Sequence, residues 1–139
     1  MYGLDTNVVV ELRKANDGRA DRHVVAWAVR IAPPGLFLST ITILELELGA
    51  LLIERCDPAQ GAVVRAWLND RVLPDFADRM LPIDTDVARR CAALHVSDPH
   101  TERDALIAAT ALVHGMTVVT RNVADFAATA VPVINPWQT

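Results

Sequence analysis

The stretch Asp104-Ala-Leu-Ile-Ala-Ala-Thr-Ala-Leu112 places one acidic residue at the head of a run that is otherwise small and apolar. It is followed by His114-Gly115 and then by the β-branched Thr117-Val118-Val119. This order predicts a buried helix, a glycine C-cap and a buried strand. An ionised carboxylate is costly to bury unless it is compensated. Asp104 is therefore expected to be either the N-terminal cap of this helix or a ligand.

The same alternation of short apolar strands and amphipathic helices continues on both sides of this stretch. Strands are predicted at Met1–Leu4, Leu36–Leu38, Met80–Ile83, Thr117–Val119 and Val131–Ile134. Helices are predicted between them, with N-terminal signals at Asp21, at Asp57-Pro58 and at Asp84 or Thr85. His95–Thr101 is predicted to be a polar loop, and a short helical piece is expected at Asp125-Phe126. The alternation predicts an α/β fold in one domain, 1–139, with a parallel sheet covered by helices on both faces.

Composition narrows the class of protein. The 139 residues are 52% hydrophobic and carry a formal net charge of −4, so no general basic field exists and any contact with nucleic acid must be local. Cys56 and Cys91 are isolated, which favours reduced thiols and disfavours a zinc site. No segment approaches the roughly 20 apolar residues of a membrane span. A soluble, cytoplasmic protein is expected.

Polar residues gather where the predicted strands end. Asp5 and the turn containing Asn122 and Asp125 directly follow strands, Glu45 lies early in the helix after a strand, and Asp104 begins a helix that leads into one. In a parallel sheet these ends share one edge, with neighbouring strands about 5 Å apart. The four sites are therefore expected to converge.

Converging carboxylates repel one another unless a cation lies between them. Oxygen ligands without Cys or His favour Mg²⁺ or Mn²⁺, and such a site suits phosphodiester hydrolysis. Each acid also has a structural explanation: Asp5 can cap the end of its strand, and Asp125 can close a turn. Glu45 and Glu47 share one amphipathic helix, where one of them is expected to be only solvated.

Four motifs together resemble the PIN-domain ribonucleases of the VapC toxin type, close to the FitB-like branch. They are Leu4-Asp-Thr-Asn7, Thr42-Ile-Leu-Glu45-Leu with Gly49, Asp104-Ala-Leu-Ile-Ala-Ala-Thr-Ala, and Thr120-Arg-Asn-Val-Ala-Asp-Phe126. The likeness runs from Leu4 to Trp137. It implies a three-layer α/β/α PIN domain with a mainly parallel sheet. It also implies a Mg²⁺- or Mn²⁺-dependent endoribonuclease that pairs with a small VapB-like antitoxin and commonly forms a homodimer.

The resemblance assigns roles to individual residues. Asp5 and Asp104 match the principal metal ligands, and Glu45, the acid of the Thr-x-x-Glu-Leu motif, is expected to be a metal ligand with them. Relatives often have an Asp at the place of Asn122, whereas here the nearest acid is Asp125, so either residue can complete the site. Thr6 and Thr120 are expected to orient the carboxylates or a water, while Asn7 can be only a helix cap.

Two other functions stay open at this point. A haloacid-dehalogenase-like phosphatase shares only Leu-Asp-Thr, and it requires a second Asp where this chain has Asn7. A catalytically weak PIN domain that acts as a nucleic-acid-binding partner in an antitoxin repressor complex is favoured by Asn122 alone. The apolar face of Val63–Leu68, or the helix of Glu45–Leu52, is expected to form a groove for an antitoxin helix.

The remaining basic and aromatic residues give weaker signals. Arg13, Lys14 and Arg121 are expected on solvated surface, with phosphate contact as the alternative. The tryptophans are expected in the core or at an interface: Trp27, Trp67 and Trp137.

Overall fold

The computed structural model describes residues 1–97 and 101–138. Five strands form one sheet in the order β3-β2-β1-β4-β5, and every neighbouring pair is parallel. The strands are β1 (Tyr2–Leu4), β2 (Leu36–Ser39), β3 (Met80–Leu81), β4 (Thr117–Val119) and β5 (Val133–Ile134). The predicted parallel α/β sheet is confirmed.

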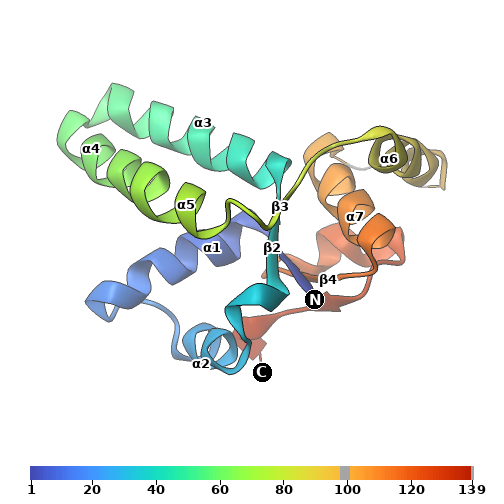
Figure 1. Cartoon of the computed structure of the whole chain (residues 1–139), viewed down its shortest axis with the longest axis horizontal. Coiled ribbons are helices and arrows are strands. Elements are labelled where there is room, and N and C mark those ends of the chain that lie inside the picture. The colour runs from blue at the N-terminus through green and yellow to red at the C-terminus, as the bar shows by residue number, and fades with distance from the viewer. Residues whose placement is uncertain (98–100, 139) are drawn as a thin grey trace.

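Seven α-helices lie within the described ranges. They are α1 (Thr6–Arg13), α2 (Arg22–Arg30), α3 (Thr40–Cys56), α4 (Pro58–Trp67), α5 (Leu73–Asp75), α6 (Thr85–Ser97) and α7 (Glu102–His114). Helices α3, α4 and α5 lie together on one side of the sheet, and α6 and α7 lie on the other (Figure 1). The shorter turns include a 3₁₀ segment at Val123–Thr129, where a helical piece was predicted, and another at Pro136–Gln138. None of the helices in the described ranges is long and apolar enough to cross a membrane.

Successive residues of the central strands point to opposite faces, as a β-strand requires. Leu4, Leu38 and Val119 belong to a core cluster with α1, α2, α3 and α4. Val118 belongs to a second cluster, built mainly with α7. Because β2 and β4 have apolar residues on both faces, the sheet is covered on both sides, which gives the α/β/α layering.

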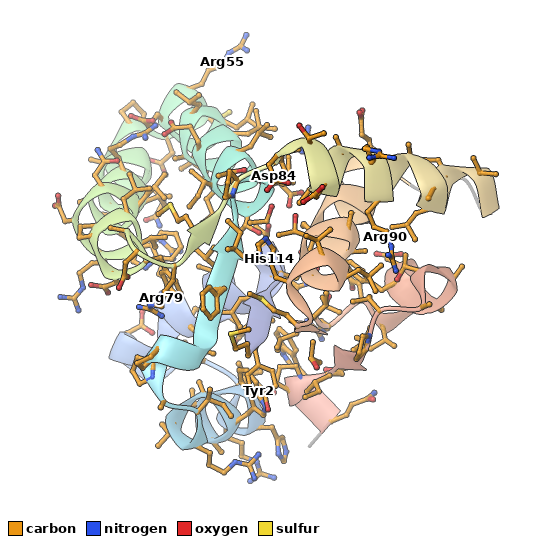
Figure 2. All side chains as sticks on the ribbon, turned by 45° about the vertical axis from the view of Figure 1, so that its right-hand side comes forward. Tyr2, Arg55, Arg79, Asp84, Arg90 and His114 are labelled. Atoms are coloured by element: carbon orange, nitrogen blue, oxygen red, sulfur yellow. The ribbon has the colours of Figure 1, made fainter. Side chains whose placement is uncertain are left out.

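The predicted caps are confirmed at three helices. Asp21 accepts the N–H groups of His23 and Val24, and Asp57 accepts that of Gln60 ahead of Pro58. Asp84, at the start of α6 in Figure 2, accepts the N–H of Val87 at 3.0 Å and is therefore the cap in preference to Thr85. These short polar side chains satisfy N–H groups that have no partner within the helix.

Several predicted bounds are wrong, and β3 ends at Leu81 and not at Ile83. His95 to Ser97 continue α6 and do not begin a loop, because the helical hydrogen bonding extends past the last inward apolar residue; 98–100 lie outside the described residues. The last strand is shorter than predicted and begins at Val133. Pro132 has no N–H to give to the ladder, although its carbonyl accepts the N–H of Val118 at 2.9 Å.

Gly61 allows α4 to lie directly against α3. A Cβ at this position would lie 2.5 Å from Cα of Glu54, a backbone atom of α3. Next to this contact, the guanidinium of Arg65 on α4 binds the carboxylates of Glu47 and Glu54 on α3. Glu47, predicted to be a solvated neighbour of Glu45, is thus in a salt bridge between the two helices and outside the acidic pocket.

Candidate functional site

The strand order brings the predicted acidic residues to one edge of the sheet. Asp5 follows the central strand β1, and Glu45 lies in α3, which begins directly after β2. Helix α7 runs back before β4, so its first turn, which contains Asp104, lies at the edge where the parallel strands end. All three side chains line one pocket of about 430 Å³.

The rest of this acidic pocket comes from the neighbouring connections. Its lining residues are Asp5, Thr6, Asn7, Val10, Glu11, Glu45, Asp104, Arg121, Asn122 and Trp137. Asn122 therefore lies where the sequence placed the fourth member of the site. Asp125 is exposed and does not line the pocket; its backbone N–H donates to the carbonyl of Asn122 in a turn. The geometry thus separates the two candidates for that position.

Asp5 is the most constrained of the carboxylates. Only 6% of its surface is exposed. Oδ1 accepts the backbone N–H of Thr6 at 2.8 Å, which makes Asp5 the cap of α1, and Oδ2 accepts the hydroxyl of Thr120 at 2.8 Å. The cap that was one explanation of Asp5 therefore exists together with its position in the pocket.

Burial raises the pKa of Asp5 above its usual value, and the nearby carboxylates of Asp104 and Glu45 raise it further. The hydrogen bonds from Thr120 and Thr6 act in the opposite direction, but they do not cancel the cost of burying the charge. An ionised Asp5 is thus a buried negative charge close to two others, and a cation would relieve this repulsion.

Glu45 and Asp104 are each held by a threonine. Oε1 of Glu45 accepts the hydroxyl of Thr6 at 2.7 Å, and its Oε2 lies 3.8 Å from a guanidinium nitrogen of Arg103. Oδ2 of Asp104 accepts the hydroxyl of Thr101 at 2.6 Å. Thr101, the residue before α7, occupies the cap position. Asp104 is the third residue of the helix, so its interpretation as the cap is wrong.

Thr120 connects the first strand to the turn that contains Asn122. It is fully buried; its hydroxyl donates to Asp5 and accepts the backbone N–H of Asn122 at 3.0 Å. The Nδ2 of Asn7 lies 3.4 Å from both Asp5 Oδ2 and Thr120 Oγ1, and Asn7 Oδ1 accepts the N–H of Arg121 at 3.3 Å. Asn7 therefore joins the ends of β1 and β4 and does not serve as the cap of α1.

The sequence analysis gave phosphate contact by Arg121 only as an alternative to solvated surface, and it did not place Trp137 at this pocket. The guanidinium of Arg121 lies over the indole of Trp137, with Cζ 5.3 Å from the ring centroid. The available signal was position: both residues follow strands of the same parallel sheet, β4 and β5, and so emerge at the edge that contains the carboxylates.

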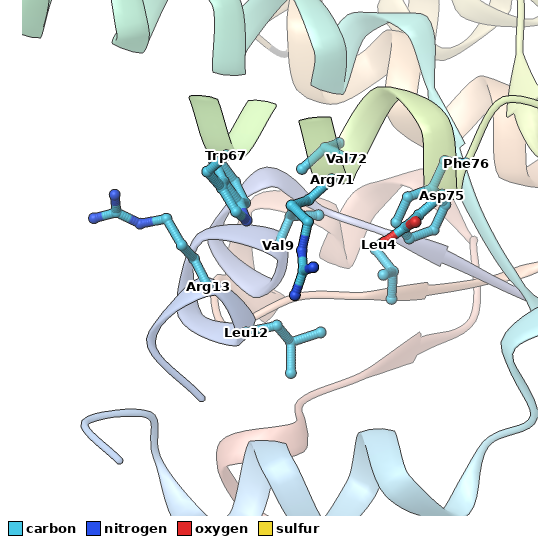
Figure 3. A pocket seen from close by; sticks show the side chains of 9 residues that line it. All are labelled: Leu4, Val9, Leu12, Arg13, Trp67, Arg71, Val72, Asp75 and Phe76. Atoms are coloured by element: carbon cyan, nitrogen blue, oxygen red, sulfur yellow. The ribbon is translucent and has the colours of Figure 1, made fainter. Parts of the chain in front are cut away.

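A second cavity, of about 180 Å³, lies between α1 and the α4–α5 region (Figure 3). Its walls are mainly apolar, with Arg13 beside Trp67 at one side and Asp75 as its one carboxylate. A lone carboxylate among apolar walls does not make an acidic site. The chemistry expected from the sequence therefore belongs to the acidic pocket.

A model of the PIN domain matches residues 2–132 of the chain. The chain belongs to the PIN-domain family. Its sequence is 38% identical to a protein named VapC ribonuclease Y4jK from Sinorhizobium fredii, over 99% of both chains. It superposes on the crystal structure of FitAcB from Neisseria gonorrhoeae with a TM-score of 0.90 and 35% identity over the full length of both chains. It also matches a toxin-antitoxin complex from Klebsiella pneumoniae, with a TM-score of 0.69 and 28% identity over 98% of both chains.

These findings confirm the family and the three-layer fold expected from the four motifs. The oxygen-only donor set of the pocket, with a buried carboxylate repelled by two others, fits a hard divalent cation. Within 1–97 and 101–138, however, no three acidic, His or Cys side chains are already arranged as a closed metal site. Two of the carboxylates instead contact neighbouring side chains, Glu45 those of Thr6 and Arg103 and Asp104 that of Thr101.

Proposed function

We propose that this PIN domain is the ribonuclease toxin of a toxin–antitoxin pair and cleaves RNA phosphodiesters with Mg²⁺ or Mn²⁺. The observation that carries the proposal is the convergence of Asp5, Glu45 and Asp104, from three separate elements, on one pocket. The full-length likeness to a chain named as a VapC ribonuclease supports the same chemistry.

Several residues of the pocket have a proposed role in binding the metal ion. Asp5 and Asp104 would hold the cation, with Glu45 and the amide oxygen of Asn122 beside them. When bound, a divalent ion supplies a water that is acidic enough to attack near neutral pH, and it offsets charge on the phosphate. Thr120 and the N–H of Thr6 fix the orientation of Asp5.

We propose that Glu45 is the general base that accepts a proton from the attacking water. Its Oε1 is occupied by the hydroxyl of Thr6, whereas Oε2 is contacted only loosely by Arg103, at 3.8 Å. Oε2 can therefore accept the proton of the attacking water. A bond from the water oxygen to phosphorus would form in line as the bond from phosphorus to one ribose oxygen breaks, and that leaving oxygen would take up a proton from solvent.

The decisive test is incubation of mixed cellular RNA with the purified protein, with Mg²⁺, with Mn²⁺ and with EDTA. Discrete fragments are expected only with metal, and Asp104→Asn should abolish them. Glu102→Gln is the matched control, because Glu102 lies in the same turn of α7 and does not line the pocket. Equal cutting by wild type and Asp104→Asn would refute the assignment.

The alternative is a catalytically weak PIN domain that binds nucleic acid within an antitoxin complex. It is favoured by the uncharged Asn122 and by the lack of a closed metal site among the described residues. Absence of cleavage with every metal, together with DNA binding by the antitoxin complex, would support this function.

An antitoxin partner is part of the proposal. A groove of about 120 Å³ between α1, α3 and α4 is lined mainly by apolar side chains, including Val10, Ile53 and Trp67, and it shares Thr6 and Glu45 with the acidic pocket. Such a groove suits an amphipathic helix. Both predicted faces contribute to the groove: Val64 and Trp67 line it from α4, and α3 lines it through Glu45 to Ile53, whereas Val63 and Leu68 do not line it.

Gly49 lines this groove and has open space around it, so Gly49→Arg should block antitoxin binding while Gly49→Ala should not. The measurement is co-purification of the antitoxin with each variant. Retention by Gly49→Arg would place the partner elsewhere.

A homodimer is the second expected assembly. Helix α3 exposes an apolar stripe at helical spacing formed by Leu44, Leu48, Leu51 and Leu52. We assign self-association to this stripe. Light scattering should give a dimer for the wild type and a monomer for Leu48→Glu.

A further inference from the structure

Arg121 and Trp137 form a cationic, aromatic wall of the acidic pocket. The guanidinium lies over the indole at 5.3 Å, within the range of a cation–π interaction, and both residues line the pocket. Within the described part of the chain, no carboxylate forms an ion pair with Arg121. Its charge is therefore held at the pocket and not neutralised there.

The backbone around this pair is fixed from both sides. The N–H of Arg121 donates to Oδ1 of Asn7, and its carbonyl accepts Nδ2 of Asn135 at 3.5 Å. Oδ1 of the same Asn135 accepts the N–H of Trp137 at 3.0 Å. One asparagine thus links the two residues of the pair, while Asn7 links Arg121 to the acidic side of the pocket.

The indole of Trp137 also packs against the core of the protein. Trp137 is half-buried and packs against the core cluster that contains Leu4 and Val119. A half-buried indole carrying a guanidinium presents a rigid surface to the pocket, so little side-chain freedom is lost when a ligand binds there.

Two other arginines in 1–97 and 101–138 lie over aromatic rings; Arg13 lies over Trp67, but neither of those residues lines the acidic pocket. Arg79 also lies over an aromatic ring, that of Phe76, but its guanidinium donates to the carbonyls of Pro33, Leu36 and Asp75. Its donors are used in holding the fold together. Within the described residues the guanidinium of Arg121 donates no hydrogen bond, and Arg121 is an exposed residue that lines the pocket.

An acidic pocket repels a polyanion, so an RNA that enters it needs compensating positive charge and a surface for its bases. An arginine fork binds phosphate oxygens, and aromatic or guanidinium planes stack single-stranded bases. We propose that Arg121 and Trp137 bind the single-stranded RNA next to the scissile phosphate, Arg121 through a phosphate and Trp137 through contact of a base with the part of the indole that neither the guanidinium nor the core covers. This inference rests on the proposed nuclease function and adds the residues that position its substrate.

The test is binding of a fluorescein-labelled single-stranded oligo(U) 12-mer by fluorescence anisotropy, with Ca²⁺ in place of Mg²⁺ and the RNA checked on a gel. Arg121→Ala should weaken binding about 10-fold or more, and the salt dependence should lose roughly 0.7 of its slope because one phosphate contact is gone. Trp137→Leu keeps an apolar side chain against the core; it should weaken binding about 5-fold or more at an unchanged salt slope.

Arg121→Lys should restore the salt slope and part of the affinity, since it keeps the charge but loses the planar stack. Arg55→Ala is the matched control: Arg55 is exposed at the end of α3 and projects away from the body of the protein (Figure 2). It should bind within about 2-fold of wild type, as a surface arginine outside the contact would. Ultraviolet crosslinking should join the oligonucleotide to the peptide that contains Trp137.

The outcomes separate this proposal from the nuclease itself. If the wild type cuts RNA while Arg121→Ala and Trp137→Leu bind RNA as tightly as the wild type, the proposed RNA contact by Arg121 and Trp137 is wrong and the proposed nuclease function stands. If RNA binding depends on Arg121 and Trp137 but no metal supports cutting, the proposed nuclease function is wrong and the proposed RNA contact stands. Crosslinks of the oligonucleotide found only outside residues 121–138 would also contradict the proposed RNA contact.

Discussion

The hydroxyl of Thr120 donates a 2.8 Å hydrogen bond to Oδ2 of Asp5 across 115 positions of sequence. Both residues directly follow neighbouring parallel strands, β4 and β1, so the bond ties together two strand ends at the edge of the sheet that contains the pocket. A carboxylate held in this way is oriented before any ligand arrives.

Thr120→Val tests this hydrogen bond with a side chain of the same shape. The valine removes the hydroxyl that donates to Oδ2 of Asp5 and accepts the N–H of Asn122, and Asn7 remains near Oδ2 at only 3.4 Å. The free energy of unfolding should fall by about 1–2 kcal/mol and cutting should fall about 10-fold. Urea denaturation and metal-dependent cleavage measure the two effects. Thr120→Ser keeps the hydroxyl and should stay close to wild type; equal losses in both variants would point to packing instead.

Asp5→Asn should abolish cutting by more than about 100-fold, because a charged ligand is lost, while the protein stays folded. The pKa of Asp5 is raised in the folded state, so the folded protein favours the protonated carboxyl. Wild-type stability relative to Asp5→Asn should therefore fall as pH rises from the unfolded pKa of about 3.9 through the folded value, and then level off.

Thermal melts between pH 3 and 8 in EDTA measure this difference. Added Mg²⁺ should stabilise the wild type at neutral pH and leave Asp5→Asn unchanged. A stability difference that grows in favour of the wild type with rising pH would contradict the raised pKa.

Asn122→Asp restores a charge at the pocket, whereas Asp125→Asn removes one outside it. The first substitution should lower the metal concentration needed for half-maximal cutting several-fold, since a further carboxylate strengthens the attraction for a hard cation. The second should leave that concentration unchanged. Metal titrations of cleavage distinguish them, and a strong effect of Asp125→Asn would show that the turn rearranges when metal binds.

Gly61→Ala should destabilise the fold by about 1–3 kcal/mol, because the added Cβ would meet the backbone of Glu54 at 2.5 Å and force α3 and α4 apart. Gly49→Ala, at a position in α3 where nothing lies within 4 Å of a new Cβ, should stabilise it by about 0.4–1 kcal/mol. Chemical denaturation of both variants gives the comparison. If both substitutions raised the free energy of unfolding, helix propensity and not close packing would dominate at Gly61.

The sequence by itself determined the features that depend on a few neighbouring residues. The helix starts at Asp21, Asp57 and Asp84 follow from short side chains that reach their own next turn. The alternation of apolar strands and helices was sufficient to predict a parallel sheet with polar residues at its C-terminal edge. The choice of Asp5, Glu45 and Asp104 came from that edge and from the motifs of the family.

Only the tertiary structure decided which of these residues meet. The strand order sets β1 between β2 and β4, and this long-range pairing brings Thr120 to Asp5 and places Asn122 in the pocket while Asp125 remains outside. The stack of Arg121 on Trp137 likewise joins residues that follow different strands. Local periodicity reports which face of an element is apolar, but not which elements become neighbours, because strand pairing depends on contacts between segments distant in the chain.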